Sequence, residues 1–177
     1  MKTVFALGVL AALCQAALGL KGGIYTIRSA SSGNSSLLTA SSEGKPLVFR
    51  PDQKKNDTQA WAFIPVGANG RTFRIHNLKG DFLNCNETEG VPCYAGLTPQ
   101  VFTAESAGAD KYELVDEQGT GSFLQASSNS TLVLADWDPS PSPSQQFHVV
   151  PYVYDLSTFP MALEMWTDLA SFYHRPH

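Results

Sequence analysis

The sequence predicts an all-β fold assembled from three internal repeats. A Gln-x-aromatic phrase occurs three times. Each copy follows a Leu-x-small pair and, before that, an aromatic-x-aliphatic pair, so the same landmarks recur in the same order about every 40 to 45 residues. A repeat of that length is one supersecondary unit, which buries its apolar face only by packing against its copies. The three copies are Gln59-Ala60-Trp61, Gln100-Val101-Phe102 and Gln145-Gln146-Phe147.

The bulk composition agrees with one globular, β-rich domain. The chain has 177 residues, of which 43% are hydrophobic and 16% are charged. These values suit a folded β protein better than a disordered chain or a coiled coil. The formal net charge is −4, and Lys and Arg form no cluster. We therefore expect no nucleic-acid partner and no attraction to anionic membranes.

Residues 1–19 predict a secretory signal peptide. Lys2 supplies the positive start, an apolar run follows at 4–13, and Ala17-Leu18-Gly19 supplies the small residues of a cleavage site. A membrane anchor is the alternative, but the apolar run falls short of the ~20 residues that a span needs. The sequence thus predicts a secreted, extracellular protein without a membrane span.

Each repeat of the predicted domain, residues 22–151, is expected to contain four short strands. Short apolar runs alternate with Gly, Pro, Asn and Ser turns, and no part of this region has helical periodicity. The repeats cover about 22–66, 70–107 and 110–151. In the first repeat the expected strands are 24–28, 37–40, 46–49 and 59–64.

Residues 152–177 predict an amphipathic helix outside the repeats. Ser157 and Pro160 suit a helix start, because proline is tolerated in the first turn. We expect this helix to pack on the β domain, and a helix for a partner or for self-association is the alternative. His174 and His177 lie at the chain end, so no metal site is expected there. The apolar face consists of Ala162, Met165, Trp166, Leu169, Phe172 and Tyr173.

Two cysteines remain after the predicted leader is removed, and they predict a disulfide. Cys85 and Cys93 are an even number in an oxidising compartment, and the intervening residues 86–92 contain a turn signal. The bridge would join a hairpin within the second repeat. A metal site is the alternative, which the absence of nearby histidines disfavours.

Four Asn-x-Ser/Thr sequons agree with a secreted glycoprotein. All four fall in predicted turns between strands, where a bulky glycan can reach solvent. The predicted glycosylation sites are Asn34, Asn56, Asn86 and Asn129.

Twelve strands in three equivalent units resemble the β-trefoil, in which six strands form a short barrel and three hairpins cap one end. The Gln-x-Trp/Phe phrase is similar to that of ricin-B-type lectins and their fungal relatives, and the resemblance covers residues 22 to about 151. It implies a carbohydrate-binding protein with shallow loop sites. We expect the aromatic residue of each phrase to fill the core and the Gln to fix a loop or reach a ligand.

The chain departs from the ricin-B-type pattern at strand two of each repeat. That family usually carries an Asp in a Leu-Asp-Val phrase, whereas Thr39, Asn84 and Gln125 stand here. The paired cysteines of each family repeat are also missing. Galactose specificity is therefore not carried over.

The best sugar-site candidate lies in the third repeat. Trp137 offers a planar face for a sugar ring, and Asp136 and Asp138, with Gln145 and Gln125, offer acceptors and amides for hydroxyl groups. A rim tryptophan that packs on the C-terminal helix is the alternative. The sequon at Asn129 is expected close to this site, where its glycan would crowd the ligand. The matching stretch Phe49-Arg50-Pro51-Asp52 of the first repeat ranks second.

No nucleophile, metal-protease or phosphate-loop motif is present, so we expect neither an enzyme nor a cofactor. Glycans or glycoproteins are the expected partners. A β-trefoil protease inhibitor is the alternative, because residues 23–28 and 59–65 also resemble fungal inhibitors of that fold. Lys54-Lys55 or Arg50 would then enter a protease pocket, although a glycan at Asn56 would obstruct it. A structural glycoprotein without a ligand is the third possibility.

Overall fold

A computed structural model describes residues 19–53, 56–108, 110–117, 121–140 and 142–153, and these residues form a 12-stranded sheet with two short 3-10 helices. The first repeat holds β1 (Gly23–Ser29), β2 (Ser36–Thr39), β3 (Val48–Pro51) and β4 (Trp61–Pro65). The second holds β5 (Thr72–Asn77), β6 (Phe82–Asn84), β7 (Tyr94–Gly96) and β8 (Val101–Ser106). The third holds β9 (Lys111–Asp116), β10 (Phe123–Ala126), β11 (Leu132–Ala135) and β12 (Phe147–Pro151).

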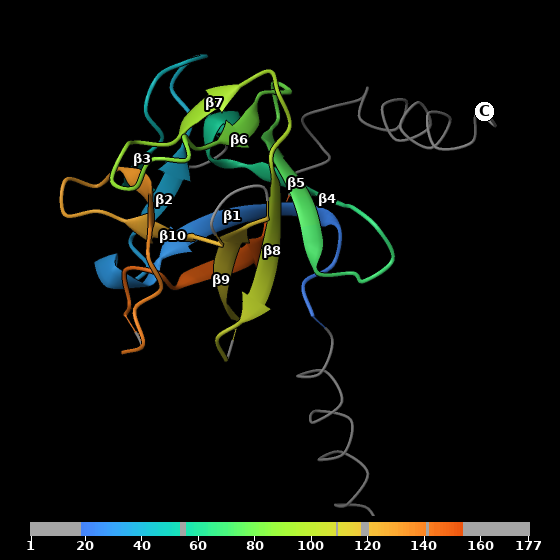
Figure 1. Cartoon of the computed structure of the whole chain (residues 1–177). Coiled ribbons are helices and arrows are strands. Elements are labelled where there is room, and N and C mark those ends of the chain that lie inside the picture. Colours follow the sequence, from blue (N-terminus) through green and yellow to red (C-terminus); the bar gives the residue numbers. More distant parts are fainter. Residues whose placement is uncertain (1–18, 54–55, 109, 118–120, 141, 154–177) are drawn as a thin grey trace, which may run out of the picture.

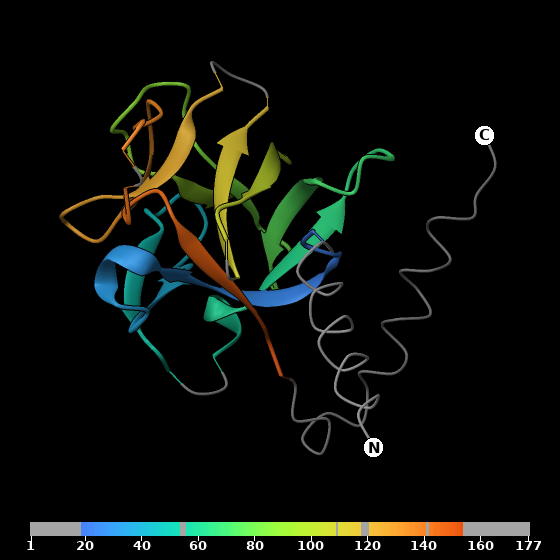
Figure 2. The ribbon, with the colours of Figure 1, turned by 90° about the horizontal axis from the view of Figure 1, so that it is seen from below.

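Six of these strands close into a barrel (Figures 1 and 2). β1 pairs with β12 and β4, β5 pairs with β4 and β8, and β9 pairs with β8 and β12, all antiparallel. Each repeat contributes its first and last strand, so no repeat closes the ring alone. Closure removes the open edges that short strands would otherwise expose.

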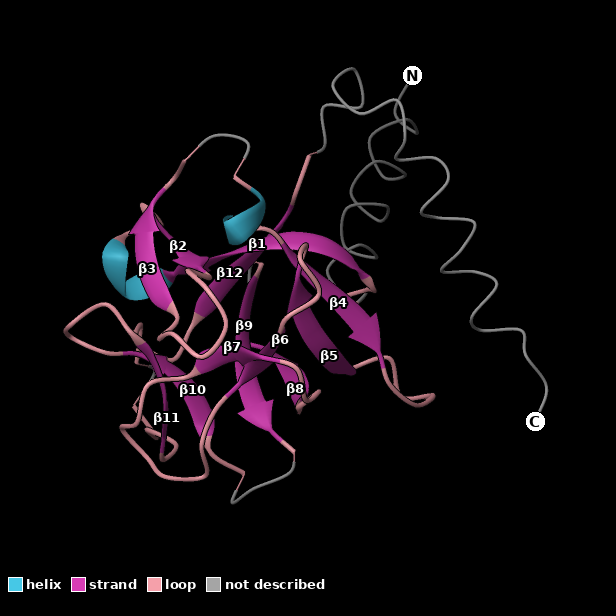
Figure 3. Ribbon diagram, turned by 90° about the horizontal axis from the view of Figure 1, so that it is seen from above, coloured by secondary structure: helices cyan, strands magenta, loops and turns pink. Residues whose placement is uncertain are grey.

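The second and third strands of each repeat form a hairpin, and the three hairpins bond to one another (Figure 3). Leu47 N–H donates to the Cys93 carbonyl at 2.8 Å, Cys93 N–H to the Leu132 carbonyl at 2.7 Å, and Leu132 N–H to the Leu47 carbonyl at 3.0 Å. This ring of bonds takes one residue from each repeat. The all-β prediction and the β-trefoil architecture are thereby confirmed.

The aromatic residue of each Gln-x-aromatic phrase fills the core, as predicted. Trp61, Phe102 and Phe147 are each 0% exposed, because they occupy inward positions of the last strand of their repeats. The indole N–H of Trp61 donates to the Leu38 carbonyl at 3.0 Å, so the buried ring leaves no polar group unpaired.

Two details of the first repeat differ from the expected strands. β3 begins at Val48 and not at Pro46, which has no N–H to give to a strand ladder. Gln59 lies in the 3-10 helix η2 (Asp57–Gln59) and not in a strand. Asn56 caps this helix, because its Oδ1 accepts the Thr58 N–H at 3.0 Å.

The predicted disulfide is present. Cys85 and Cys93 are bonded, with their Cα atoms 4.1 Å apart, and the bridge closes the loop between β6 and β7. The predicted C-terminal helix lies outside the described residues, as does nearly all of the predicted leader. In the part of the chain that is described, no helix is long and apolar enough to cross a membrane.

Candidate carbohydrate-binding site

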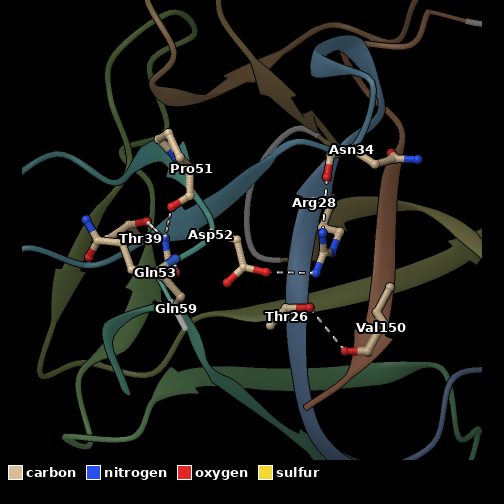
Figure 4. A network of polar contacts seen from close by, with 9 residues as sticks. All are labelled: Thr26, Arg28, Asn34, Thr39, Pro51, Asp52, Gln53, Gln59 and Val150. Carbon is tan, nitrogen blue, oxygen red and sulfur yellow. Dashed lines mark hydrogen bonds and ion pairs between the residues drawn. The ribbon is translucent and has the colours of Figure 1, made fainter. Parts of the chain in front are cut away.

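The Gln of the first phrase holds the loop between β3 and β4 (Figure 4). Its Oε1 accepts the Gln53 N–H at 2.9 Å, and its Nε2 donates to the Pro51 carbonyl and to Thr39 Oγ1, both at 3.0 Å. Gln59 itself is 1% exposed. The side chain therefore joins the end of β2 to the chain that leaves β3.

Gln145 makes the equivalent set of bonds in the third repeat. Its Oε1 accepts the Asp138 N–H at 3.1 Å, and its Nε2 donates to the Asp136 carbonyl at 2.6 Å and to Gln125 Oε1 at 3.3 Å. It is 2% exposed, so it holds the loop and presents no surface of its own. The backbone on both sides of Trp137 is fixed by this one side chain.

Trp137 projects from the loop that Gln145 holds. It is 58% exposed, which is unusual for the largest apolar side chain. Asp138 Oδ1 accepts the Ser140 N–H at 2.9 Å, a local turn that further orders the loop. An exposed indole on a loop whose backbone is held in this way is suited to stack on the apolar face of a sugar ring.

The five sequence-predicted residues form one cluster. Asp136, Trp137 and Asp138 are exposed, Gln125 is half-buried, and Gln145 lies beneath them. Asp136, Trp137 and Asp138 can contact a ligand directly. Gln125 can do so only through its amide nitrogen, because its Oε1 already accepts a hydrogen bond from Gln145. Gln145 is placed to position the others.

Glu89 belongs to this site although no sequence pattern points to it. A side-chain hydrogen bond with Asp136, followed by burial and by the charge of Asp136, raises the pKa of the Glu89 carboxyl. Glu89 comes from the loop between β6 and β7 of the second repeat. Neither its spacing nor its neighbours could have linked it to Trp137, because the contact depends on how two repeats pack.

The matching loop of the first repeat presents a different surface. Asp52 stands there in place of Trp137, and its Oδ2 lies 3.4 Å from Nη2 of Arg28 on β1. Nη1 of Arg28 donates to the Asn34 carbonyl at 3.2 Å (Figure 4). The carboxylate is thus partnered within the chain, and no aromatic side chain lies beside it on the loop.

The second repeat lacks the loop. Only residues 97–100 separate β7 from β8, and Leu97 is 71% exposed at this turn. The Gln100 Oε1 accepts the Cys85 N–H at 2.7 Å and so holds the end of β6 directly.

The sequons lie between strands, as predicted, but Asn129 is not close to Trp137. Asn129 lies in the turn that follows Ala126 of β10, and Trp137 follows the opposite end of the same hairpin, where Phe123 pairs with Ala135. The expected crowding at Asn129 was therefore wrong. Asn86 lies on the same loop as Glu89 and is the sequon next to the site.

The residues considered for protease inhibition are only partly described. Arg50 is exposed near the end of β3, while Lys54 and Lys55 lie outside the described residues. Among the residues that are described, no group of three or more His, Cys, Asp or Glu side chains could hold a metal ion.

The fold resembles that of solved lectins. The Rhizoctonia solani agglutinin is 15% identical with a TM-score of 0.64, over 76% of this chain and 99% of that one. The Polyporus squamosus lectin bound to a Neu5Ac-Gal-GlcNAc epitope is 19% identical with a TM-score of 0.62, over 73% of this chain and 49% of that one. No protein-family model and no curated protein matches the sequence.

Enzymes carry the same fold as a module. A Clostridium perfringens endo-β-galactosidase is 16% identical with a TM-score of 0.61, over 73% of this chain and only 32% of that one. At these identities the likeness establishes a common fold and no common ligand. The chain therefore has the fold of the β-trefoil lectins, as its repeats predicted.

Proposed function

We propose that this chain is a secreted carbohydrate-binding protein whose site lies at Trp137 in the third repeat. The observation that carries the proposal is the 58% exposure of an indole whose loop is held by the buried Gln145. A fixed aromatic face with carboxylates on both sides meets the two needs of a shallow sugar site, stacking and hydrogen bonding to hydroxyls. The lectin neighbours support the same reading.

A binding role fits this site better than catalysis. Glycosidases use two carboxyl groups roughly 5 Å or more apart, so that the glycosidic bond lies between them. The carboxyl groups of Glu89 and Asp136 lie close enough for a side-chain hydrogen bond to raise the pKa of Glu89, which is closer than this separation. The domain would therefore act without a catalytic centre of its own, on glycans or glycoproteins outside the cell.

Trp137→Ala tests the proposal on a glycan array. The secreted, glycosylated protein is expected to give specific signals that Trp137→Ala abolishes and Trp137→Phe partly keeps, because phenylalanine retains an aromatic face. The melting temperature should change by only a few degrees, since the side chain is mostly exposed. A variant that unfolds would instead give Trp137 a structural role.

Protease inhibition is the second candidate, and Leu97 favours it. Its side chain is 71% exposed on the short turn between β7 and β8, three residues before Gln100, whose side chain is bonded to the Cys85 N–H. Inhibitors present such an exposed residue on an ordered loop. A blank glycan array, together with protease inhibition that Leu97→Glu removes, would replace the lectin proposal with this one.

A further inference from the structure

The loop of the second repeat lies alongside the strand that leads to Trp137. Gly90 N–H donates to the Leu134 carbonyl at 2.9 Å, and Cys93 N–H donates to the Leu132 carbonyl at 2.7 Å. Between them, Pro92 pairs with Val133 in an antiparallel bridge. The loop thus runs along β11 toward Ala135, the last residue of that strand. This path places Glu89 beside Asp136.

The base of this loop is also fixed. Cys85 and Cys93 are buried and joined by the disulfide, and the Cys85 N–H is held by Gln100. The loop is therefore restrained at its base by the bridge and along its side by β11. Glu89 is placed by the fold, although its own side chain is exposed.

Two carboxyl groups flank Trp137 in the chain, those of Asp136 and Asp138, and a third, that of Glu89, lies beside Asp136. Among the described residues, the ion pair that joins Arg28 to Asp52 lies in the first repeat, and none is formed by Glu89, Asp136 or Asp138. At a pH above the raised pKa of Glu89, no ion pair in the described part of the chain therefore offsets the negative charges of Glu89, Asp136 and Asp138 on this side of the loop. The raised pKa of Glu89, caused first by its hydrogen bond to Asp136, agrees with carboxyl groups held against each other.

We propose that Glu89 is a specificity-determining residue of the Trp137 site, and that this acidic surround selects sugars bearing a protonated amine over acetylated or anionic sugars. The proposal rests on the proposed glycan-binding function. An ammonium group beside an indole and carboxylates gains from both the ring face and the negative charges. A carboxylated or sulfated sugar would meet repulsion from the same groups.

The experiment compares two ligands with the same sugar backbone, one with protonated amines and one with neutral acetylated amines. Binding of a glucosamine tetrasaccharide and of its N-acetylated counterpart is measured by calorimetry at low ionic strength, with a sialylated trisaccharide as the anionic probe. N-glycans are removed from all samples, because Asn86 lies on the same loop as Glu89. The variants are Glu89→Gln, Trp137→Ala and Glu105→Gln, the last removing one exposed charge from β8.

The wild-type chain is expected to bind the amine-bearing sugar more tightly, and Glu89→Gln should reduce that preference about two- to fivefold, the range for an exposed charge pair. Glu105→Gln should leave the preference unchanged, and high salt should weaken it. If Glu89→Gln acts no differently from Glu105→Gln while Trp137→Ala abolishes binding, the Glu89 proposal is overturned and the lectin function stands. If the wild-type chain binds no sugar on the array or in solution, both proposals fail.

Discussion

The first and third repeats use the same buried glutamine for the same purpose, yet their loops present different surfaces. Gln59 and Gln145 each accept one backbone N–H and donate to one carbonyl of the loop after the third strand. Above this common support, Asp52 is partnered by Arg28, whereas Trp137 stands exposed. The buried glutamine that supports the loop is the same in both repeats. The loop residue that faces solvent above it differs.

The second repeat explains why the glutamine has this role. In the other repeats an N–H at the end of strand two donates to a carbonyl between strands three and four: Ala40 to Thr58 at 2.9 Å and Ala126 to Ser144 at 2.8 Å. In the short second loop the equivalent Cys85 N–H donates to the side chain of Gln100 instead. The glutamine thus satisfies whichever backbone groups the loop length leaves unpaired.

The largest effects should come from the core aromatic residues, where the repeats are equivalent. Trp61→Ala and Phe147→Ala should each lower the free energy of unfolding by about 3 to 5 kcal/mol, because both rings are completely buried. Denaturant unfolding would measure the loss. A near-neutral result at either position would contradict its place in the core and break the equivalence.

Substitution of the two buried glutamines should distinguish an effect on stability from an effect on glycan binding. Gln59→Ala and Gln145→Ala should each lower the free energy of unfolding by about 1 to 3 kcal/mol, since each leaves buried loop groups unpaired. Only Gln145→Ala should also weaken glycan binding, because it releases the backbone around Trp137. Equal losses of affinity in both variants would show that binding is not confined to the third repeat.

The smallest effect should come from the ion pair of the first repeat. Arg28 and Asp52 are 28% and 48% exposed, so Asp52→Asn should lower the free energy of unfolding by at most about 1 kcal/mol. A double-mutant cycle with Arg28→Met, repeated at high salt, would isolate the pair. Glycan binding should not change, and a loss of binding in Asp52→Asn would give the first repeat a sugar site of its own.

The repeats, the resemblance that they carry and the cysteine count were together enough to predict the all-β class, the trefoil, the buried Trp61 and the disulfide between Cys85 and Cys93. These features follow from local signals, because the alternation of strands, the turn residues and the number of cysteines can be recognised in the sequence without knowledge of tertiary contacts. The grouping of Trp137 with Gln145 was likewise predictable, since both residues belong to one repeat and eight positions separate them.

Contacts between repeats, and the way that each hairpin is oriented, required the folded chain. The approach of Glu89 to Asp136 depends on bonds between one hairpin and the next, and the Arg28–Asp52 pair depends on how the loop after β3 lies against β1. Asn129 and Trp137 are only eight residues apart in sequence, but they lie at opposite ends of the β10–β11 hairpin, which only its strand pairing shows. Periodicity specifies which residues face inward along a strand, but the neighbours across strands and repeats are set only when the barrel closes and its register is chosen.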